Sequence, residues 1–442
     1  MERLYDKLKA YSESDFYAFH MPGHKRNKAL LGIELPYDLD ITEIDGFDDL
    51  HHADGILKEE QERAARVFGA EESHFLVNGS TAGILSAVMG CTHRGDKILV
   101  ARHCHKSIYH AIYMNGLVPR YVYPEFDISM HMNGEISKED VAKALAAEPD
   151  IKAVVIVSPN YDGVVSDVKG IAEVAHSYRI PLIVDEAHGP HFGFHPAFPG
   201  RANDLGADVV IDSLDMLQSS SPSYIFMASL DACVDFVDGK CENAFELYVE
   251  RLQKFREELK PLQHLQILRT EHYDISKVVI STANANITSP ELADRLRKEY
   301  HLEMEMTGGT YVLAMTTVAD TQEGLNRLKA ALLEIDDQLE AKTAVSGSIE
   351  ISGELPRLEQ YFTPQEAAER EEDGEAEEIP WKESEGHISL EYAYLYPPGS
   401  PVIVPGERIS REAVELLCYY ETQNLQIEGI QTEGKIKVWK HE

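Results

Sequence analysis

Short continuous runs of apolar residues alternate with stretches of helical spacing along the first half of the chain. Helices are predicted over 137–147, which opens with a capping box between Ser137 and Asp140, and over 168–180. Continuous apolar strands separated by helices are typical of a mostly parallel sheet with helices on both faces. The predicted strands are 97–101, 120–123, 153–157, 181–187 and 207–212, and the apolar run 74–77 is interpreted as a further strand that leads into a turn and a helix.

A second α/β pattern follows a helical stretch near 244–260. Strands are predicted at 277–282 and 310–317, and a long amphipathic helix is predicted at 321–342. A further helix over 289–300 is expected to begin with Ser289 as its N-cap. The predicted parts are an N-terminal arm (1–45), a large domain (46–243), a small α/β domain (244–345) and a C-terminal domain (346–442).

Charge and cysteine content narrow the class of protein. The 442 residues include 76 acidic and 41 basic side chains, a formal net charge of −35, which disfavours nucleic acid and anionic membranes as partners. No apolar run is long enough to span a bilayer, and the first residues have no signal-peptide pattern. Five scattered cysteines without a CxxC pair indicate reduced thiols, so we expect a cytoplasmic protein.

Three segments carry candidate chemistry. VNGSTAG (77–83) places Ser80 and Thr81 at a predicted helix start, where they form either an anion-binding cradle or an ordinary capped turn. Asp185 ends a predicted buried strand, so its carboxylate needs a cation, such as a pyridinium nitrogen. A metal site of Asp185, Glu186 and His188 is the alternative. His105 follows another strand, where it either stacks on an aromatic cofactor or has a structural role.

The order of these motifs resembles the ornithine/lysine/arginine decarboxylase family. VNGSTAG, CHKS, VDEAHGPHFGFHP and GADVV occur in the family's order, with HMPGHK before them and YPPG…VPGE after them. The resemblance implies a pyridoxal-phosphate (PLP) dependent enzyme of fold type I, with a PLP-binding large domain. The site residues that it implies are Ser80, Thr81 and Ser213 for the phosphate, His105 stacked on the ring, Asp185 at the ring nitrogen and His188 beside the ring; Ser158, Asn160 and Tyr161 occupy a flanking segment.

The resemblance also implies an activity and an assembly. The expected reaction is α-decarboxylation of a basic L-amino acid, arginine ahead of lysine and ornithine, to CO₂ and an amine used in polyamine biosynthesis. The expected assembly is a homodimer or a larger homo-oligomer, with HMPGHK and Ser220–Tyr224 reaching the neighbouring subunit. Transamination, supported by a carboxylate-binding arginine among Arg269, Arg295 and Arg297, and a non-catalytic binding protein are the alternatives.

The chain departs from the family pattern at the residue that should hold the cofactor. The family continues from Ser213 into Ser-X-His-Lys, but Asp215 and Met216 stand where the His and Lys are expected. The residues that follow resemble a segment that the family places well beyond its lysine. This indicates that a stretch of the family sequence is missing from the chain at this point. A segment missing from the printed sequence, a natural deletion and an engineered deletion all fit this gap. Lys106 and Lys25 are poor substitutes, because Lys106 adjoins the stacking histidine.

Overall fold

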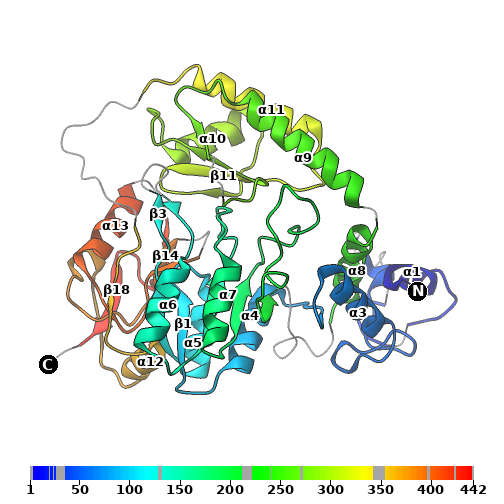
Figure 1. Cartoon of the computed structure of the whole chain (residues 1–442), viewed down its shortest axis with the longest axis horizontal. Helices are drawn as coiled ribbons and strands as arrows, with labels where there is room; N and C mark the ends of the chain where they lie inside the picture. The colour runs from blue at the N-terminus through cyan, green and yellow to red at the C-terminus, as the bar shows by residue number, and fades with distance from the viewer. Residues whose placement is uncertain are drawn as a thin grey trace. The chain divides into compact units, whose positions relative to one another are not determined.

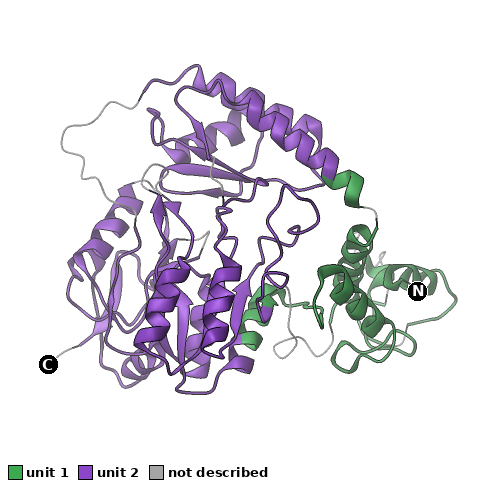
Figure 2. Cartoon of the chain, viewed as in Figure 1, with its two compact units in different colours: residues 1–87, 210–245 green, residues 88–209, 246–442 purple. Residues whose placement is uncertain are grey.

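The computed structural model describes most of the chain, and it divides into two compact units. The described residues are 3–18, 20–22, 24–25, 35–127, 132–211, 222–239, 241–268, 272–341, 354–395, 399–422 and 425–440. Unit 1 comprises residues 1–87 and 210–245, and unit 2 comprises 88–209 and 246–442 (Figure 2). The four domain boundaries given above stay a prediction.

A five-stranded sheet forms the centre of the large domain, in the order β2-β1-β5-β6-β7 (Figure 1). Its strand β1 pairs in parallel with β2 and β5, and β5 pairs in parallel with β6. Strands β1 and β5 are largely apolar and buried, as expected where helices such as α6 and α7 cover the sheet. The predicted mostly parallel α/β fold is therefore confirmed. The bounds are β1 Lys97–Ala101, β2 Val118–Val122, β5 Ile151–Val157, β6 Leu182–Asp185, β7 Val209–Ile211, α5 Lys106–Asn115, α6 Lys138–Ala147 and α7 Val168–Ser177.

Three local predictions are wrong in instructive ways. The apolar run 74–77 is not a strand, although helix α4 (Gly79–Cys91) does begin at the predicted turn. Ser137 precedes α6 without capping it, because its hydroxyl donates to Glu139 instead (3.0 Å). Helix α10 (Ser289–Tyr300) is capped by Thr288, one residue earlier than predicted, in a reciprocal capping box with Glu291.

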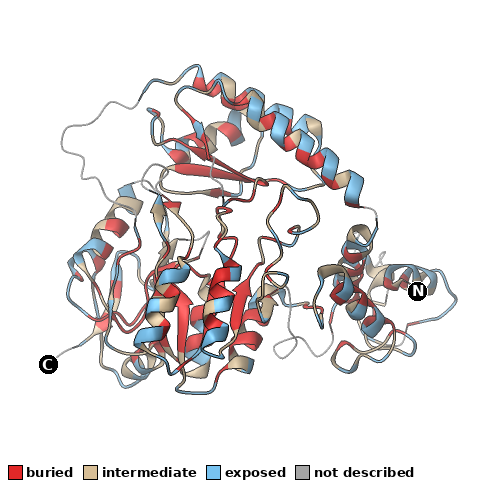
Figure 3. Cartoon of the chain, in the orientation of Figure 1, coloured by how far each residue is buried: buried red, intermediate tan, exposed pale blue. Residues whose placement is uncertain are grey.

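The small domain is an antiparallel sheet in the order β10-β11-β9-β8, with one face covered by helices. Val278 and Ile280 of β9 point into an apolar core with Leu292 and Leu296 of α10. Val279, between them in sequence, belongs to a second cluster on the other face, with Tyr273. Figure 3 shows this buried strand layer. The bounds are β8 Gln266–Ile267, β9 Lys277–Ser281, β10 Met306–Thr307, β11 Tyr311–Met315, α9 Cys241–Glu258 and α11 Gln322–Asp336.

The C-terminal part contains small antiparallel sheets around one apolar core that includes Trp381 and Val438. The acidic stretch 366–378, predicted as an exposed helix or loop, is helical only as far as Glu372 and enters a strand at Ala376. The bounds are β12 Glu359–Gln360, β13 Ala376–Pro380, β14 Ala393–Leu395, β15 Pro401–Ile403, β16 Glu407–Arg408, β17 Ile427–Glu428, β18 Lys435–Trp439, α12 Pro364–Glu372 and α13 Arg411–Thr422. The short elements β3 Phe126–Asp127, β4 Met132–Asn133 and the 3-10 turn Trp381–Glu383 complete unit 2.

Unit 1 is mainly helical and has its own core. Leu4, Leu57 and Met227, one from each of its helices α1, α3 and α8, are fully buried in it. Arg63 donates to Asp231 in the same interior. The bounds are α1 Leu4–Ser12, α3 Ile56–Phe68 and α8 Tyr224–Val237, with 3-10 turns Tyr37–Leu39 and Leu50–His52. Within the part of the chain that the structure describes, no helix is both long and apolar enough to cross a bilayer.

Candidate active site

Asp185 lies at the carboxyl end of β6, where open α/β sheets bind their ligands. Its side chain is buried, and burial raises the pKa of its carboxyl group to about 6. The backbone N–H of Ala187 donates to its Oδ1 (3.2 Å). Among the described residues, no lysine, arginine or histidine pairs with this carboxylate. A buried carboxylate with a single hydrogen bond and no cation is a strong receptor for a positively charged ligand group.

His105 ends the loop after β1 and is the N-cap of helix α5. Its Nδ1 accepts a hydrogen bond from the Ser107 N–H (3.3 Å) and lies 2.9 Å from the Ser107 hydroxyl, which fixes the ring. Burial, helped by the neighbouring Lys106 charge, lowers the pKa of His105 to about 4. The ring is therefore neutral at pH 7. A fixed neutral ring can stack on a flat aromatic group without a charge penalty.

His188 lies in the loop after β6, three residues beyond Asp185, and Tyr161 packs against it edge-on. The two ring centroids are 4.5 Å apart. Burial and the nearby charge of Lys277 lower the pKa of His188 to about 4, and His105 adds to this effect. The structure thus brings His105 and His188 into one electrostatic neighbourhood. Tyr161 donates from its hydroxyl to Glu305, which joins the large domain to the strand region of the small domain.

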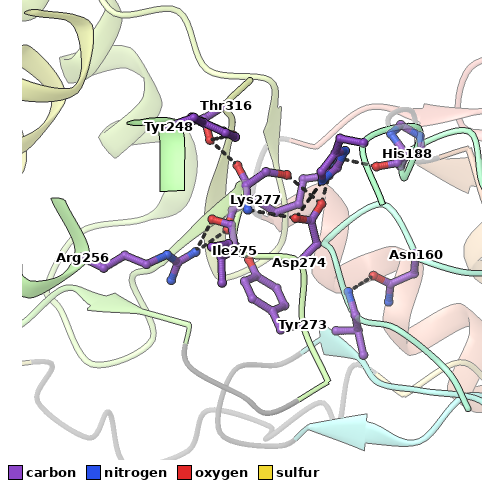
Figure 4. Close-up of polar contacts among 12 residues, drawn as sticks. Asn160, His188, Tyr248, Arg256, Tyr273, Asp274, Ile275, Lys277 and Thr316 are labelled. Atoms are coloured by element: carbon purple, nitrogen blue, oxygen red, sulfur yellow. Dashed lines mark hydrogen bonds and ion pairs between the residues drawn. The ribbon is translucent and has the colours of Figure 1, made fainter. Parts of the chain in front are cut away.

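Lys277 is a residue of this neighbourhood that sequence reasoning missed. It is the first residue of β9, and its Nζ donates to the backbone carbonyl of His188 (3.2 Å, Figure 4). Its side chain is only 6% exposed and lies 3.8 Å from Asp274 Oδ2. Gly163 makes room for it, because a Cβ there would lie 2.7 Å from Lys277 Cγ. A lysine opening a strand gives no sequence signal for such burial.

The remaining predicted site residues lie elsewhere or outside the described residues. Ser80 and Thr81 are in the first turn of α4, where helix N–H groups can bind an anion, and Thr81 is exposed. They belong to unit 1, whereas His105, Asp185 and His188 belong to unit 2. Ser213 lies outside the described residues. The roles assigned to all six residues stay predictions.

The side chains involved give little support to the two alternative interpretations of the site, a metal site and a carboxylate-binding arginine for transamination. Glu186 accepts a hydrogen bond from the Ala202 N–H (3.0 Å), and the described residues contain no group of three or more metal-ligating side chains. Arg295 pairs with Glu299 (3.2 Å), and Arg297 pairs with Asp294 (3.2 Å), both on the surface of α10. Arg269 lies outside the described residues.

The residues present fit part of a PLP molecule. Asp185 offers the buried negative charge that a pyridinium nitrogen needs, and His105 offers a neutral ring of fixed orientation. The lysine that would carry the aldehyde is absent from its expected position after Ser213.

Comparisons with known proteins agree with the motif order. Residues 3–213 match the major domain of the Orn/Lys/Arg decarboxylases, and residues 353–434 match their C-terminal domain. The arginine decarboxylase of Bacillus subtilis (strain 168) is 31% identical over 471 residues, covering 96% of this chain and 95% of that protein. This alignment is longer than the whole 442-residue chain, so it contains gaps on this side.

Solved structures show the same fold. The constitutive lysine decarboxylase of Escherichia coli superposes with a TM-score of 0.80 at 21% identity, over 99% of this chain and 82% of that one. An alanine–glyoxylate aminotransferase from Nostoc sp. reaches a TM-score of 0.51 at 14% identity, over 63% of this chain and 86% of that one. The large sheet and small domain thus follow the architecture of these proteins.

Proposed function

Because this chain belongs to the Orn/Lys/Arg decarboxylase family, we propose that it binds PLP and removes the α-carboxylate of a basic amino acid. The observation that carries the proposal is Asp185, a buried carboxylate without a cationic partner among the described residues. Arginine is the preferred substrate, since the B. subtilis relative, 31% identical over nearly the whole chain, is named an arginine decarboxylase. Lysine and ornithine follow.

The proposed contacts are those that the family resemblance implies. Asp185 holds the proton on the ring nitrogen, His105 stacks on the ring, and His188 stands beside it. Ser80, Thr81 and Ser213 bind the phosphate. When bound, the cofactor supplies an electron sink for the bond between the substrate Cα and its carboxylate. Since the pKa of His188 is about 4, its imidazole is neutral at pH 7 and can hold a proton on one ring nitrogen only.

The test is CO₂ release from arginine, lysine and ornithine by purified protein supplied with PLP. We expect arginine to be the fastest substrate and Asp185→Ala to abolish the release. Asp337→Asn is the matched control, because Asp337 is an exposed carboxylate at the end of α11. No release from any of the three amino acids would contradict a decarboxylase.

A non-catalytic PLP-binding protein is the second candidate function, and the gap after Ser213 favours it. CO₂ release is the measurement that distinguishes the two candidates. A binding protein would quench the fluorescence of added PLP, lose that response in Asp185→Ala, and release no CO₂ from any basic amino acid.

The proposal also includes the cellular compartment, the use of the product and the oligomeric state of the protein. None of the five cysteines forms a disulfide, which suits a cytoplasmic chain in a reducing compartment, and the product amine would enter polyamine biosynthesis. We also infer a homodimer, since fold-type-I sites commonly use residues of two subunits. Light scattering on the eluted protein would give the mass of the assembly, and a monomer would overturn this part.

A further inference from the structure

A PLP site needs an amine to carry the cofactor aldehyde, and this chain has no lysine at the expected position after Ser213. Lys277 is the one lysine buried among the described residues. Lys106, weighed above as a substitute, points instead to Tyr394, with its Nζ 3.5 Å from the tyrosine hydroxyl and over the tyrosine ring. Lys25 donates to the carbonyl of His20 in unit 1.

The backbone that carries Lys277 is firmly held (Figure 4). Tyr273 donates from its hydroxyl to the Lys277 carbonyl (2.5 Å), and Arg256 donates to the same oxygen (2.7 Å). Tyr248 and Thr316 hydrogen-bond to each other (2.7 Å), and Thr316 donates to the Ser276 carbonyl (2.7 Å). The start of β9 therefore presents the Lys277 amine at one place, beside the loop that carries His188.

The Lys277 amine lies in surroundings that favour a nucleophile. Burial lowers its pKa, while the charges of Asp274 and Glu305 oppose this effect. Asp274 is itself well satisfied, because it accepts from the Ser276 N–H (2.9 Å) and hydroxyl (2.7 Å) and contacts His191 Nε2 (3.1 Å). A desolvated lysine of lowered pKa is the kind that forms Schiff bases with carbonyl groups.

We propose that Lys277 is the amine that carries PLP in this chain, through an imine between its Nζ and the cofactor aldehyde. The step rests on the proposed PLP binding. The ammonium first loses a proton, and the free amine adds to the aldehyde carbon. A C=N double bond then forms, while the aldehyde oxygen leaves as water, so no oxidant or reductant is consumed.

The experiment traps this bond in the unaltered chain. Purified protein is mixed with PLP, reduced with borohydride, digested and mapped by mass spectrometry, so that an imine becomes a stable adduct on one lysine. We expect a near-stoichiometric adduct on the peptide containing Lys277, together with a visible absorbance band before reduction. An intact mass of 49.6 kDa beforehand establishes that the protein holds no additional lysine segment.

Variants give a second test of the same bond. Lys277→Arg should lose the band and the adduct, whereas Lys143→Arg, an exposed lysine paired with Asp140 (2.8 Å), should keep both. An unchanged thermal midpoint shows that Lys277→Arg is folded. If it does not fold, the adduct map of the unaltered chain decides alone.

The outcomes separate this inference from the proposed function. A main adduct on another lysine, or PLP bound with Asp185-dependent quenching but no adduct, would overturn the role of Lys277 and leave PLP binding standing. Failure to bind PLP at all would overturn both. An intact mass several kDa above the expected value would overturn the inference as well, because a conventional lysine segment would then be present.

Discussion

At the scale of the single residue, the buried carboxylate of Asp185 is proposed to bind the ligand but lowers the stability of the folded chain. Its pKa of about 6 in the folded chain exceeds the ordinary aspartate value of 3.8, so the folded state binds more protons than the unfolded state between these values. Stability is therefore lost as the pH rises through this window, by roughly 3 kcal/mol once the group is fully ionised. We expect Asp185→Asn to make the cofactor-free chain more stable at pH 7.5 and to bind PLP far more weakly.

Thermal unfolding at pH 7.5 and pH 4.5 measures the first effect. The advantage of Asp185→Asn over the unaltered chain should shrink at the lower pH, where Asp185 takes up a proton, and Asp337→Asn should show no such trend. PLP titration by fluorescence measures the second effect. An Asp185→Asn chain that binds PLP as tightly as the original would contradict the assigned contact.

A second residue-scale prediction concerns Asp274, whose negative charge raises the pKa of Lys277. Asp274→Asn should lower the pKa of Lys277 further, because burial then acts with less opposition. The pH at which the visible imine band is half formed should therefore move to a lower value. The absorbance is followed from pH 5 to pH 10, with Asp337→Asn as control. A shift to higher pH would show that Asp274 does not act on the amine.

At the scale of the element, helix starts show where sequence reasoning falls short. The spacing of SPELADRLRKEY predicted α10 with its observed bounds, but it named Ser289 as the N-cap. Thr288 holds that place, and the Ser289 hydroxyl donates to the Gly308 carbonyl (2.6 Å). Two adjacent hydroxyl residues are equivalent as caps in a sequence. The loop that approaches one of them decides between the two.

Thr288→Ala should therefore destabilise the protein by about 1 kcal/mol, the usual effect of losing a cap. Thr288→Ser keeps the accepting oxygen and should cost much less. Chemical denaturation followed by circular dichroism compares the two variants. Equal losses for alanine and serine would mean that the capping hydroxyl contributes nothing.

The same contrast applies to the strands and to the site. Continuous apolar runs predicted β1, β5 and β6, and with them the position of Asp185 at a strand end. Lys277 was predicted only as the start of a strand. Its burial depends on His188, 89 positions earlier, and on Gly163, so no local pattern could reveal it. Local spacing predicts elements, whereas the partners of a buried charge come from the tertiary fold.

At the scale of the whole molecule, one buried ion pair joins the large sheet to the C-terminal part. Arg102, directly after β1, donates to Glu407 Oε2 (3.1 Å) and to the Pro401 carbonyl (2.5 Å). Arg102→Met should destabilise unit 2 by about 3–5 kcal/mol, because Glu407 is left buried without its cation. The double variant Arg102→Met with Glu407→Leu should recover much of this loss.

Denaturant unfolding and limited proteolysis of the C-terminal part measure both changes. The exposed pair of Lys143 and Asp140 is the control, and Lys143→Met should change stability by less than about 1 kcal/mol. A double variant as unstable as Arg102→Met alone would show that lost packing, rather than the unpaired charge, causes the effect.

The buried carboxylate of Asp185 has a consequence for the life of the protein in a cell. A ligand that binds only the folded chain lowers the unfolded fraction. The effect grows with the ratio of the free ligand concentration to the dissociation constant. Proteases remove the unfolded fraction continuously, so a change of 1–2 kcal/mol can alter abundance several-fold. Under the proposed binding of PLP, a cell short of this cofactor would hold less of the protein at an unchanged rate of synthesis.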